Sequence, residues 1–193
     1  MQLSLPRFFD RNNNTDTRPY RLGICLSGGG ARGFAHIGAL KAITEVGLQP
    51  DIIAGVSAGA MAATLFSAGV PLDEVVPLFA EKKFTDFASL AIRDGGGLFK
   101  LDGLRKFLVK NTGVNRLEKL RIPTYIGVTD IDNGVHAEFH EGPLGDMVAA
   151  SCSIPVVFQP VKIGGTYYVD GGVLRNLPAW AIRCLLYTSP SPR

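Results

Sequence analysis

The sequence predicts an α/β fold, a three-layer α/β/α sandwich with a mainly parallel central sheet. Two observations predict it. Short apolar runs of strand length alternate with longer segments whose apolar residues recur at helical spacing, which is typical of βαβ units around buried parallel strands. Turns between these segments hold many of the 23 glycines, a number above average usage. The 193 residues, 46% hydrophobic and 19% charged, suffice for one globular domain with a sizeable core.

A βαβ unit forms the first part of this domain. An apolar strand is expected over residues 22–26 and a second over residues 51–54. Between them, a glycine loop at residues 27–33 leads into residues 34–46, where the apolar spacing predicts a helix. Gly47 is expected to close that helix as its C-cap.

The later elements alternate in the same way. Pro77 predicts a kink in its helix, and Asp102 is expected to be the N-cap of another. Residues 84–99 are expected to be irregular, with Gly95-Gly96-Gly97 as a flexible connection or lid. The other expected elements are helices at 60–65, 71–83, 102–111 and 144–151, and strands at 122–129, 135–140, 161–163 and 166–169.

A serine in a tight turn follows the second strand. The turn reads Gly55-Val56-Ser57-Ala58-Gly59 and precedes a helix of small residues, which is the layout of a nucleophile elbow. Such a turn strains the backbone of the serine, and glycines two residues to either side leave room for it. The hydroxyl then projects over a helix N-terminus, where negative charge is favoured. The alternative is a plain glycine turn with an exposed serine.

The glycine loop fits two kinds of site, and one is a dinucleotide site. Residues 28–33 satisfy G-x-G-x-x-G between a strand and a helix. Asp51 lies near the position of a ribose-binding acid, but it begins its strand, whereas that acid normally ends one. A nucleotide-binding protein therefore stays open as a rival.

The same loop can instead supply an oxyanion hole. Consecutive N–H groups at a helix N-terminus form a nest for developing negative charge, and an arginine can add charge or pin the loop. A hydrolase needs a nucleophile and such donors, and neighbouring βα turns of one sheet provide both. The candidates are Gly28, Gly29, Gly30 and Arg32, with Gly33 as a further motif glycine.

The serine needs a base, and the three histidines are weak candidates. His36 lies one turn into the first helix, where packing or capping accounts for it. His136 and His140 lie on the expected hairpin and are interpreted as solvated surface residues.

Asp170 is the stronger candidate for the base. It ends an expected strand, and Gly171 and Gly172 after it allow a close approach of backbone or substrate. Aspartate is a weak base at its ordinary pKa near 4, but a partly desolvated site raises that pKa. A turn-forming Asp-Gly is an equally weighted alternative for this motif taken alone.

Taken in order, these motifs resemble those of the patatin-like phospholipases. The resemblance covers residues 22–180 and also rests on Ala35-His36-Ile37-Gly38, on residues 150–155 and on Asn176-Leu177-Pro178. It implies a lipid acyl hydrolase of the phospholipase A or esterase type. Arg175 departs from the family pattern, which often has asparagine at that position.

The resemblance also implies roles for the site residues. Ser57 is then the nucleophile, Asp170 its partner in a Ser-Asp dyad, and residues 28–32 the oxyanion hole, with no metal and no cofactor. A phospholipid or another acyl-ester lipid is the implied substrate. A catalytically inactive lipid-binding module is a third reading.

Charge and cysteine usage bound the partners and the compartment. The net charge of +3 and the absence of a basic run argue against nucleic acid, and are compatible with transient contact with an anionic membrane surface. Cys25, Cys152 and Cys184 lack metal-ligand spacing and are expected to be reduced. With no signal peptide in residues 1–21 and no run of about 18 apolar residues, a cytoplasmic protein, peripheral at membranes, is expected.

The ends of the chain are expected to differ from its middle. Residues 1–20 are predicted to be a flexible arm, and residues 21–183 the phospholipase-like domain, incomplete at its C-terminus. Residues 184–193 show neither helical nor strand period and resemble a translated sequencing adapter, with an ordinary Pro/Ser-rich tail as the alternative. The natural protein is therefore expected to continue beyond this chain.

Overall fold

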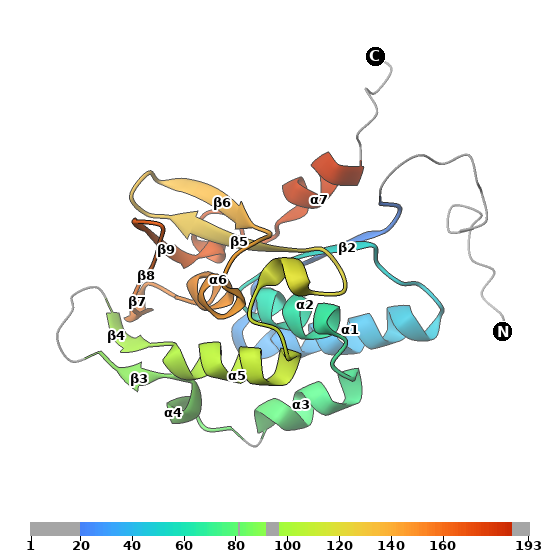
Figure 1. Ribbon diagram of the computed structural model, residues 1–193, viewed down its shortest axis with the longest axis horizontal. Coiled ribbons are helices and arrows are strands. Elements are labelled where there is room, and N and C mark those ends of the chain that lie inside the picture. The colour runs from blue at the N-terminus through green and yellow to red at the C-terminus, as the bar shows by residue number, and fades with distance from the viewer. Residues whose placement is uncertain (1–19, 81, 92–96, 187–193) are drawn as a thin grey trace, which may run out of the picture.

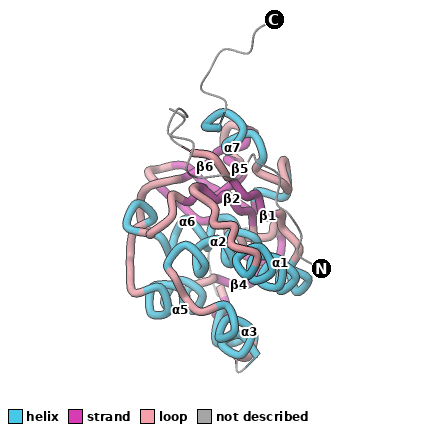
Figure 2. Tube along the Cα trace, turned by 90° about the vertical axis from the view of Figure 1, so that its right-hand side faces the viewer, coloured by secondary structure: helices cyan, strands magenta, loops and turns pink. Residues whose placement is uncertain are grey.

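The computed structural model describes residues 20–80, 82–91 and 97–186 and has three layers (Figure 1). A central sheet lies between a large helical layer and one further helix, α7 (Ala179–Leu186), on its other face (Figure 2). In the large layer, α2 (Ala58–Ala68) and α6 (Leu144–Ser151) pack directly on the sheet. The predicted α/β sandwich is confirmed. The other helices are α1 (Phe34–Glu45), α3 (Leu72–Ala80), α4 (Phe84–Phe87) and α5 (Asp102–Thr112).

The central sheet has six strands, and its first three are parallel in the order β1-β2-β5. Antiparallel β9 and β8 continue this order, and β6 pairs antiparallel with β5. The parallel part carries both glycine-containing turns at the carboxyl ends of β1 and β2. The strands are β1 (Gly23–Leu26), β2 (Ile52–Val56), β5 (Thr124–Asp130), β6 (Val135–Phe139), β8 (Val161–Ile163) and β9 (Thr166–Asp170).

One edge of β5 is shared by two strands. β2 pairs with residues 124–127 of β5, and β9 pairs with residues 128–130, while β6 occupies the opposite edge. Because β2 runs parallel to β5 and β9 runs antiparallel, the carboxyl ends of β2 and β9 meet. This register brings the turn after β2 beside Asp170, the last residue of β9.

The two faces of the sheet have separate cores. The larger lies under α2, α5 and α6, and the smaller lies between the sheet and α7. Strand β2 contributes side chains to both cores, because alternate side chains of a strand point to opposite faces of the sheet. Ile53 belongs to the larger core, and Ile52 and Ala54 belong to the smaller core. All five residues of β2 are buried, as expected for a central parallel strand.

Two local expectations are wrong. The segment predicted to be irregular contains α4, the short strand β3 (Ser89–Leu90) and β4 (Gly97–Lys100), and these strands form a second sheet with β7 (Val156–Phe158). Residues 92–96, which hold most of the predicted lid, lie outside the described residues. Leu101, not Asp102, occupies the N-cap of α5, because the backbone of Asp102 is already helical, and the Asp102 carboxylate accepts a hydrogen bond from Arg105 at 2.5 Å.

The expected ends fall largely outside the described residues, which exclude 1–19 and 187–193. Residues 184–186, expected to be aperiodic, are helical, because α7 extends to Leu186. Leu185 and Leu186 pack against the smaller core. The adapter origin of residues 184–193 stays a prediction. Across the segments that the structure describes, no helix is both long and apolar enough to cross a membrane.

Candidate active site

Ser57 has the strained backbone that the sequence predicts for it. Its φ is 53° and its ψ is −122°, a conformation that residues with a side chain rarely adopt. The flanking glycines are required by space: a Cβ at Gly55 would lie 2.4 Å from the Gly59 carbonyl oxygen, and a Cβ at Gly59 would lie 2.3 Å from that of Leu26. The turn is thereby held tightly between β1, β2 and α2.

A buried serine from α6 fixes this turn to β5. The Ser57 N–H donates to Ser151 Oγ at 2.9 Å, and Ser151 Oγ donates to the Gly127 carbonyl at 2.6 Å. Ser151 is fully buried, so these bonds are shielded from water. From the sequence, residues 150–155 were recognised only as a motif, and no role was predicted for Ser151.

Asp170 lies buried against the same turn. Its backbone is held by two bonds, with the Asp170 N–H donating to Ser153 O at 2.9 Å and Thr129 Oγ1 donating to Asp170 O at 3.0 Å. Its carboxylate accepts the Gly172 N–H at 2.7 Å and interacts with the Ser57 side chain. Burial raises the pKa of Asp170, and the interactions with Ser57 and Gly172 oppose this rise.

The glycine loop lies against Ser57, and Asn176 holds it. The Gly28 N–H donates to Asn176 O at 3.1 Å, and Asn176 Nδ2 donates to Gly28 O at 3.3 Å. A Cβ at Gly28 would lie 3.3 Å from that of Ser57. The Gly28 N–H group therefore already donates a hydrogen bond within the protein. The N–H groups of Gly29 and Gly30 have no hydrogen-bond partner among the described residues. Asn176 was part of the sequence resemblance, but its contact with the loop was not predicted.

The rest of the loop packs between α1 and α2. A Cβ at Gly33 would lie 2.4 Å from that of Ala58, so only glycine permits this approach. His36 Nε2 is 2.8 Å from Ser27 O, which ties α1 to the start of the loop. Arg32 is exposed, and its guanidinium forms no ion pair or hydrogen bond with the described part of the chain.

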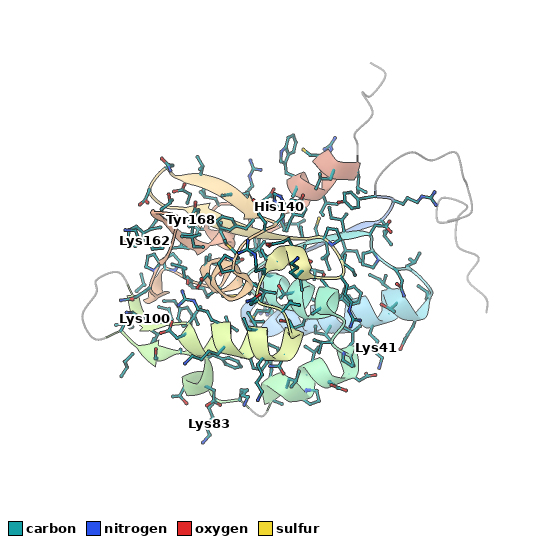
Figure 3. All side chains as sticks on the ribbon, in the orientation of Figure 1. Lys41, Lys83, Lys100, His140, Lys162 and Tyr168 are labelled. Carbon is teal, nitrogen blue, oxygen red and sulfur yellow. The ribbon has the colours of Figure 1, made fainter. Side chains whose placement is uncertain are left out.

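The other two histidines contact residues away from the turn. His136 Nε2 is 3.2 Å from Glu138 Oε1, and only 8% of the His136 side chain is exposed. The expectation that His136 is solvated is wrong, because β6 packs its ring against β5. His140, labelled in Figure 3, is exposed and stacks on Tyr125 at a ring distance of 5.0 Å.

Cys152 is an unexpected neighbour of the turn. It is buried, and its thiol interacts with the Ser57 side chain. Burial and the charge of Asp170 raise the pKa of Cys152. The thiol therefore stays protonated at neutral pH, the form that is a poor nucleophile.

Asp51 does not lie near the glycine loop. It precedes β2, whereas the loop follows β1, and these positions are at opposite ends of two parallel strands. Its Oδ2 accepts the N–H groups of Arg21 and Leu22, each at 3.0 Å. A dinucleotide bound at the loop would therefore lack this acid for its ribose.

The arrangement has the components of acyl transfer. A serine hydroxyl contacts a carboxylate whose pKa is raised, and two amide N–H groups without partners lie beside it at a helix N-terminus. Such groups can serve as a nucleophile, a base and donors for a developing oxyanion.

Comparisons with known proteins find one family model and several relatives. A family model described as patatin-like phospholipase matches residues 24–182. An uncharacterized NTE family protein of Mycobacterium tuberculosis is 35% identical over 164 residues, which are 82% of this chain and 44% of that protein. A neuropathy target esterase of Drosophila melanogaster is 34% identical over 82% of this chain and 12% of its own length. The chain thus spans less than half of these relatives.

Two further matches extend the comparison. A lysophospholipase of Emericella nidulans is 31% identical over 81% of this chain and 10% of its own length. Among solved structures, VipD from Legionella pneumophila is similar with a TM-score of 0.61 and 18% identity, over 81% of this chain and 47% of that one. At this identity the likeness concerns the fold alone.

Proposed function

Because this chain belongs to the patatin-like phospholipase family, we propose that it hydrolyses carboxylic ester bonds of lipids with Ser57 as nucleophile and Asp170 as base. The names of its relatives, a lysophospholipase and a neuropathy target esterase, support a lipid ester as the substrate class. The substrate is a phospholipid or another acyl-ester lipid, met in transient contact with a membrane surface. Nucleic acid is not a partner in this proposal.

In the first half of the reaction, Asp170 accepts the proton of Ser57 Oγ as that oxygen attacks the ester carbonyl. The negative charge on the carbonyl oxygen is stabilised by the N–H groups of Gly29 and Gly30. The proposed oxyanion hole therefore has fewer N–H donors than the sequence predicted, because the N–H of Gly28 already donates to the Asn176 carbonyl. When the tetrahedral intermediate collapses, the C–O bond to the alcohol breaks, and the alcohol takes the proton from Asp170.

In the second half, water replaces the alcohol. Asp170 takes one proton from the water as its oxygen attacks the acyl-serine carbonyl, and the same N–H groups stabilise the second oxyanion. Collapse then breaks the acyl–Oγ bond, returns the proton to Ser57 and releases a carboxylic acid. One ester and one water thus become one alcohol and one acid.

The observation that carries this proposal is that the strand register brings a strained serine and a buried, interacting carboxylate together. A serine hydroxyl is a poor nucleophile unless a base accepts its proton. Burial makes Asp170 a stronger base than an exposed aspartate, because it disfavours the charged carboxylate. A direct Ser-Asp pair therefore needs no histidine as intermediary.

Two substitutions test the dyad. We expect Ser57→Ala and Asp170→Asn each to lower the rate of hydrolysis of p-nitrophenyl esters and lysophospholipid by about 10³-fold or more. A fluorophosphonate probe is expected to label the unmodified chain at Ser57. Ser67→Ala is a matched control, because Ser67 is a fully buried serine within α2, and its hydroxyl has no hydrogen-bond partner among the described residues. Full activity in either dyad variant, with folding intact, contradicts the proposal.

The same experiment separates the two rivals. A nucleotide-binding protein predicts saturable binding of NAD(P) without labelling of Ser57. An inactive lipid-binding module predicts association with phospholipid vesicles without labelling or hydrolysis. The engaged carboxylate of Asp51 counts against the first rival.

A further inference from the structure

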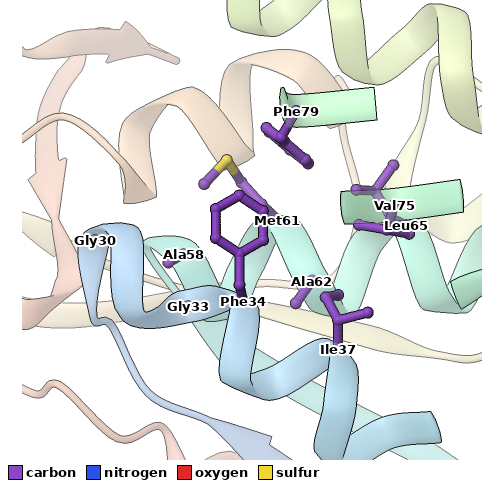
Figure 4. A pocket seen from close by; sticks show the side chains of 10 residues that line it. All are labelled: Gly30, Gly33, Phe34, Ile37, Ala58, Met61, Ala62, Leu65, Val75 and Phe79. Carbon is purple, nitrogen blue, oxygen red and sulfur yellow. The ribbon is translucent and has the colours of Figure 1, made fainter. Parts of the chain in front are cut away.

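An apolar pocket opens beside the serine turn, between α1, α2 and α3 (Figure 4). Its volume is about 50 Å³. None of its lining side chains carries a charge or a hydrogen-bonding group, so a hydrocarbon fits it better than a polar group. The lining residues are Gly30, Gly33, Phe34, Ile37, Ala58, Met61, Ala62, Leu65, Val75 and Phe79.

The pocket lies beside both the proposed nucleophile and the proposed oxyanion hole. Gly30, one of its lining residues, is also one of the two N–H donors without a partner, and Ala58 directly follows Ser57. When a carbonyl carbon is bonded to Ser57 Oγ and its oxygen points to Gly30, this adjoining pocket offers an apolar space for the third substituent of that carbon. In an ester that substituent is the acyl chain.

The pocket exists because small residues line α2 and the loop. Ala58 and Ala62 are four residues apart and therefore share one face of α2. Gly30 and Gly33 add no side chain to the space between this face and α1. A larger residue at Ala62 would fill the pocket.

Helix α3 closes the pocket opposite these small residues. It contributes Val75, its one buried residue within the described part of the helix, and the partly buried Phe79. The Phe79 ring packs edge-on against Phe34 at a centroid distance of 5.8 Å and at a tilt against Phe107 at 4.9 Å. Phe79 is thus the largest side chain that separates the pocket from the space under α5.

We propose that this pocket receives the acyl chain of the substrate and that Phe79 limits the length of the chain. This inference rests on the proposed ester hydrolysis and adds that the length of the acyl chain determines which substrates are accepted. A volume of about 50 Å³ is a third of the roughly 150 Å³ of an apolar cavity that holds benzene. The pocket as it stands therefore takes a short chain, and a longer one requires the Phe79 ring to move.

Two variants with opposite effects on the pocket test the proposal. The measurement is kcat/KM for p-nitrophenyl esters from butyrate to palmitate. We expect Phe79→Ala to raise the ratio of laurate to butyrate hydrolysis by about tenfold or more, the discrimination that one methylene gives in an apolar pocket. We expect Ala62→Leu, which fills the pocket, to lower that ratio by a similar factor. The Ala62→Leu variant keeps the test decisive if removal of the Phe79 ring unfolds the chain.

Phe139→Ala is the matched control for the loss of a ring. Phe139 lies in β6, packs against Tyr168 at 5.1 Å and does not line the pocket, so its loss is expected to leave the laurate-to-butyrate ratio unchanged. Fluorophosphonate labelling separates the two proposals. If Ser57 is labelled but neither pocket variant changes the ratio, the acyl pocket is wrong and the dyad stands. If the unmodified chain is neither labelled nor active, the proposed function itself fails.

Discussion

The burial of Asp170 determines how the proposed reaction responds to pH. The base must be ionised to accept a proton, and burial raises its pKa above the ordinary value near 4. Activity is therefore lost as the pH falls through this raised pKa, and we expect the acid limb of kcat/KM to lie above pH 4. A rate profile over pH 3–9 with a neutral ester measures it. An acid limb at or below pH 4 would mean that Asp170 is not the titrating base.

Ser151 is the residue that we expect to position the nucleophile. Ser151→Ala leaves the Ser57 N–H and the Gly127 carbonyl buried without this bridge, at a cost of about 1–3 kcal/mol in unfolding free energy. Because the turn then loses its anchor to β5, we also expect kcat to fall by about 10- to 100-fold with little change in KM. Urea unfolding and steady-state kinetics measure the two effects.

Ser153→Ala is the control for this prediction. Ser153 is equally buried, but its hydroxyl donates to Ala149 O one helical turn back and does not touch the serine turn. We expect kcat to be unchanged in this variant. If Ser151→Ala lowers stability but leaves kcat unchanged, the role of Ser151 is structural only.

At the scale of elements, the contact between β1 and α2 depends on the absence of one methyl group. A Cβ at Gly59 would lie 2.3 Å from Leu26 O, so Gly59→Ala must push α2 away from β1. We expect a loss of about 2–4 kcal/mol in unfolding free energy, and a loss of activity because α2 carries the turn. Chemical denaturation followed by circular dichroism measures the first effect.

Gly38→Ala is the opposite case. Gly38 lies within α1, and a Cβ there meets nothing within 4 Å. Alanine is favoured over glycine in a helix, so we expect a gain of about 0.5–1 kcal/mol with activity retained. Equal effects of the two substitutions would contradict the close packing at Gly59.

Elements held together by local sequence were predictable, and those held by distant contacts were not. The apolar spacing of residues 34–46 predicted α1, and the glycines around Ser57 predicted its strained turn. The second sheet was missed because β3 is two residues long and β4 pairs with the distant β7. Gly97 marks that pairing, since a Cβ there would lie 2.3 Å from the Phe158 carbonyl carbon, but a lone glycine in a sequence gives no partner.

The same distinction applies to the site. The residue types and glycine spacings indicated Ser57, Asp170 and the loop, because each motif is contiguous. Ser151, Cys152 and Asn176 contact these motifs from separate segments, and no local pattern reports such contacts. The use of the Gly28 N–H by Asn176 could not be foreseen for the same reason.

At the scale of the whole molecule, Ile182 packs α7 closely against the sheet. Ile182 is 4% exposed, and a Cβ at Gly23 would lie 2.2 Å from its Cγ2, so helix and strand are in close contact. We expect Ile182→Ala to cost about 2–5 kcal/mol, because the lost methylenes leave a cavity in the smaller core. Leu177→Ala, at a position 51% exposed, is the control and is expected to change stability by less than about 0.5 kcal/mol. An equal loss in both variants would contradict the packing of α7.

The shared edge of β5 also has a consequence for the order in which the molecule folds. The serine turn arises from β1, α1, β2 and α2, which are neighbours in sequence and close only short loops. Asp170 reaches the serine turn only when β9 pairs with β5. Asp170 and Ser57 are far apart in sequence, so the entropy cost of closing the long loop between them comes before the contact contributes any stability. A refolding chain would thus form its nucleophile turn early and remain inert until β9 docks. Recovery of activity in a refolding experiment would then follow the slow, long-range steps, later than the recovery of helix.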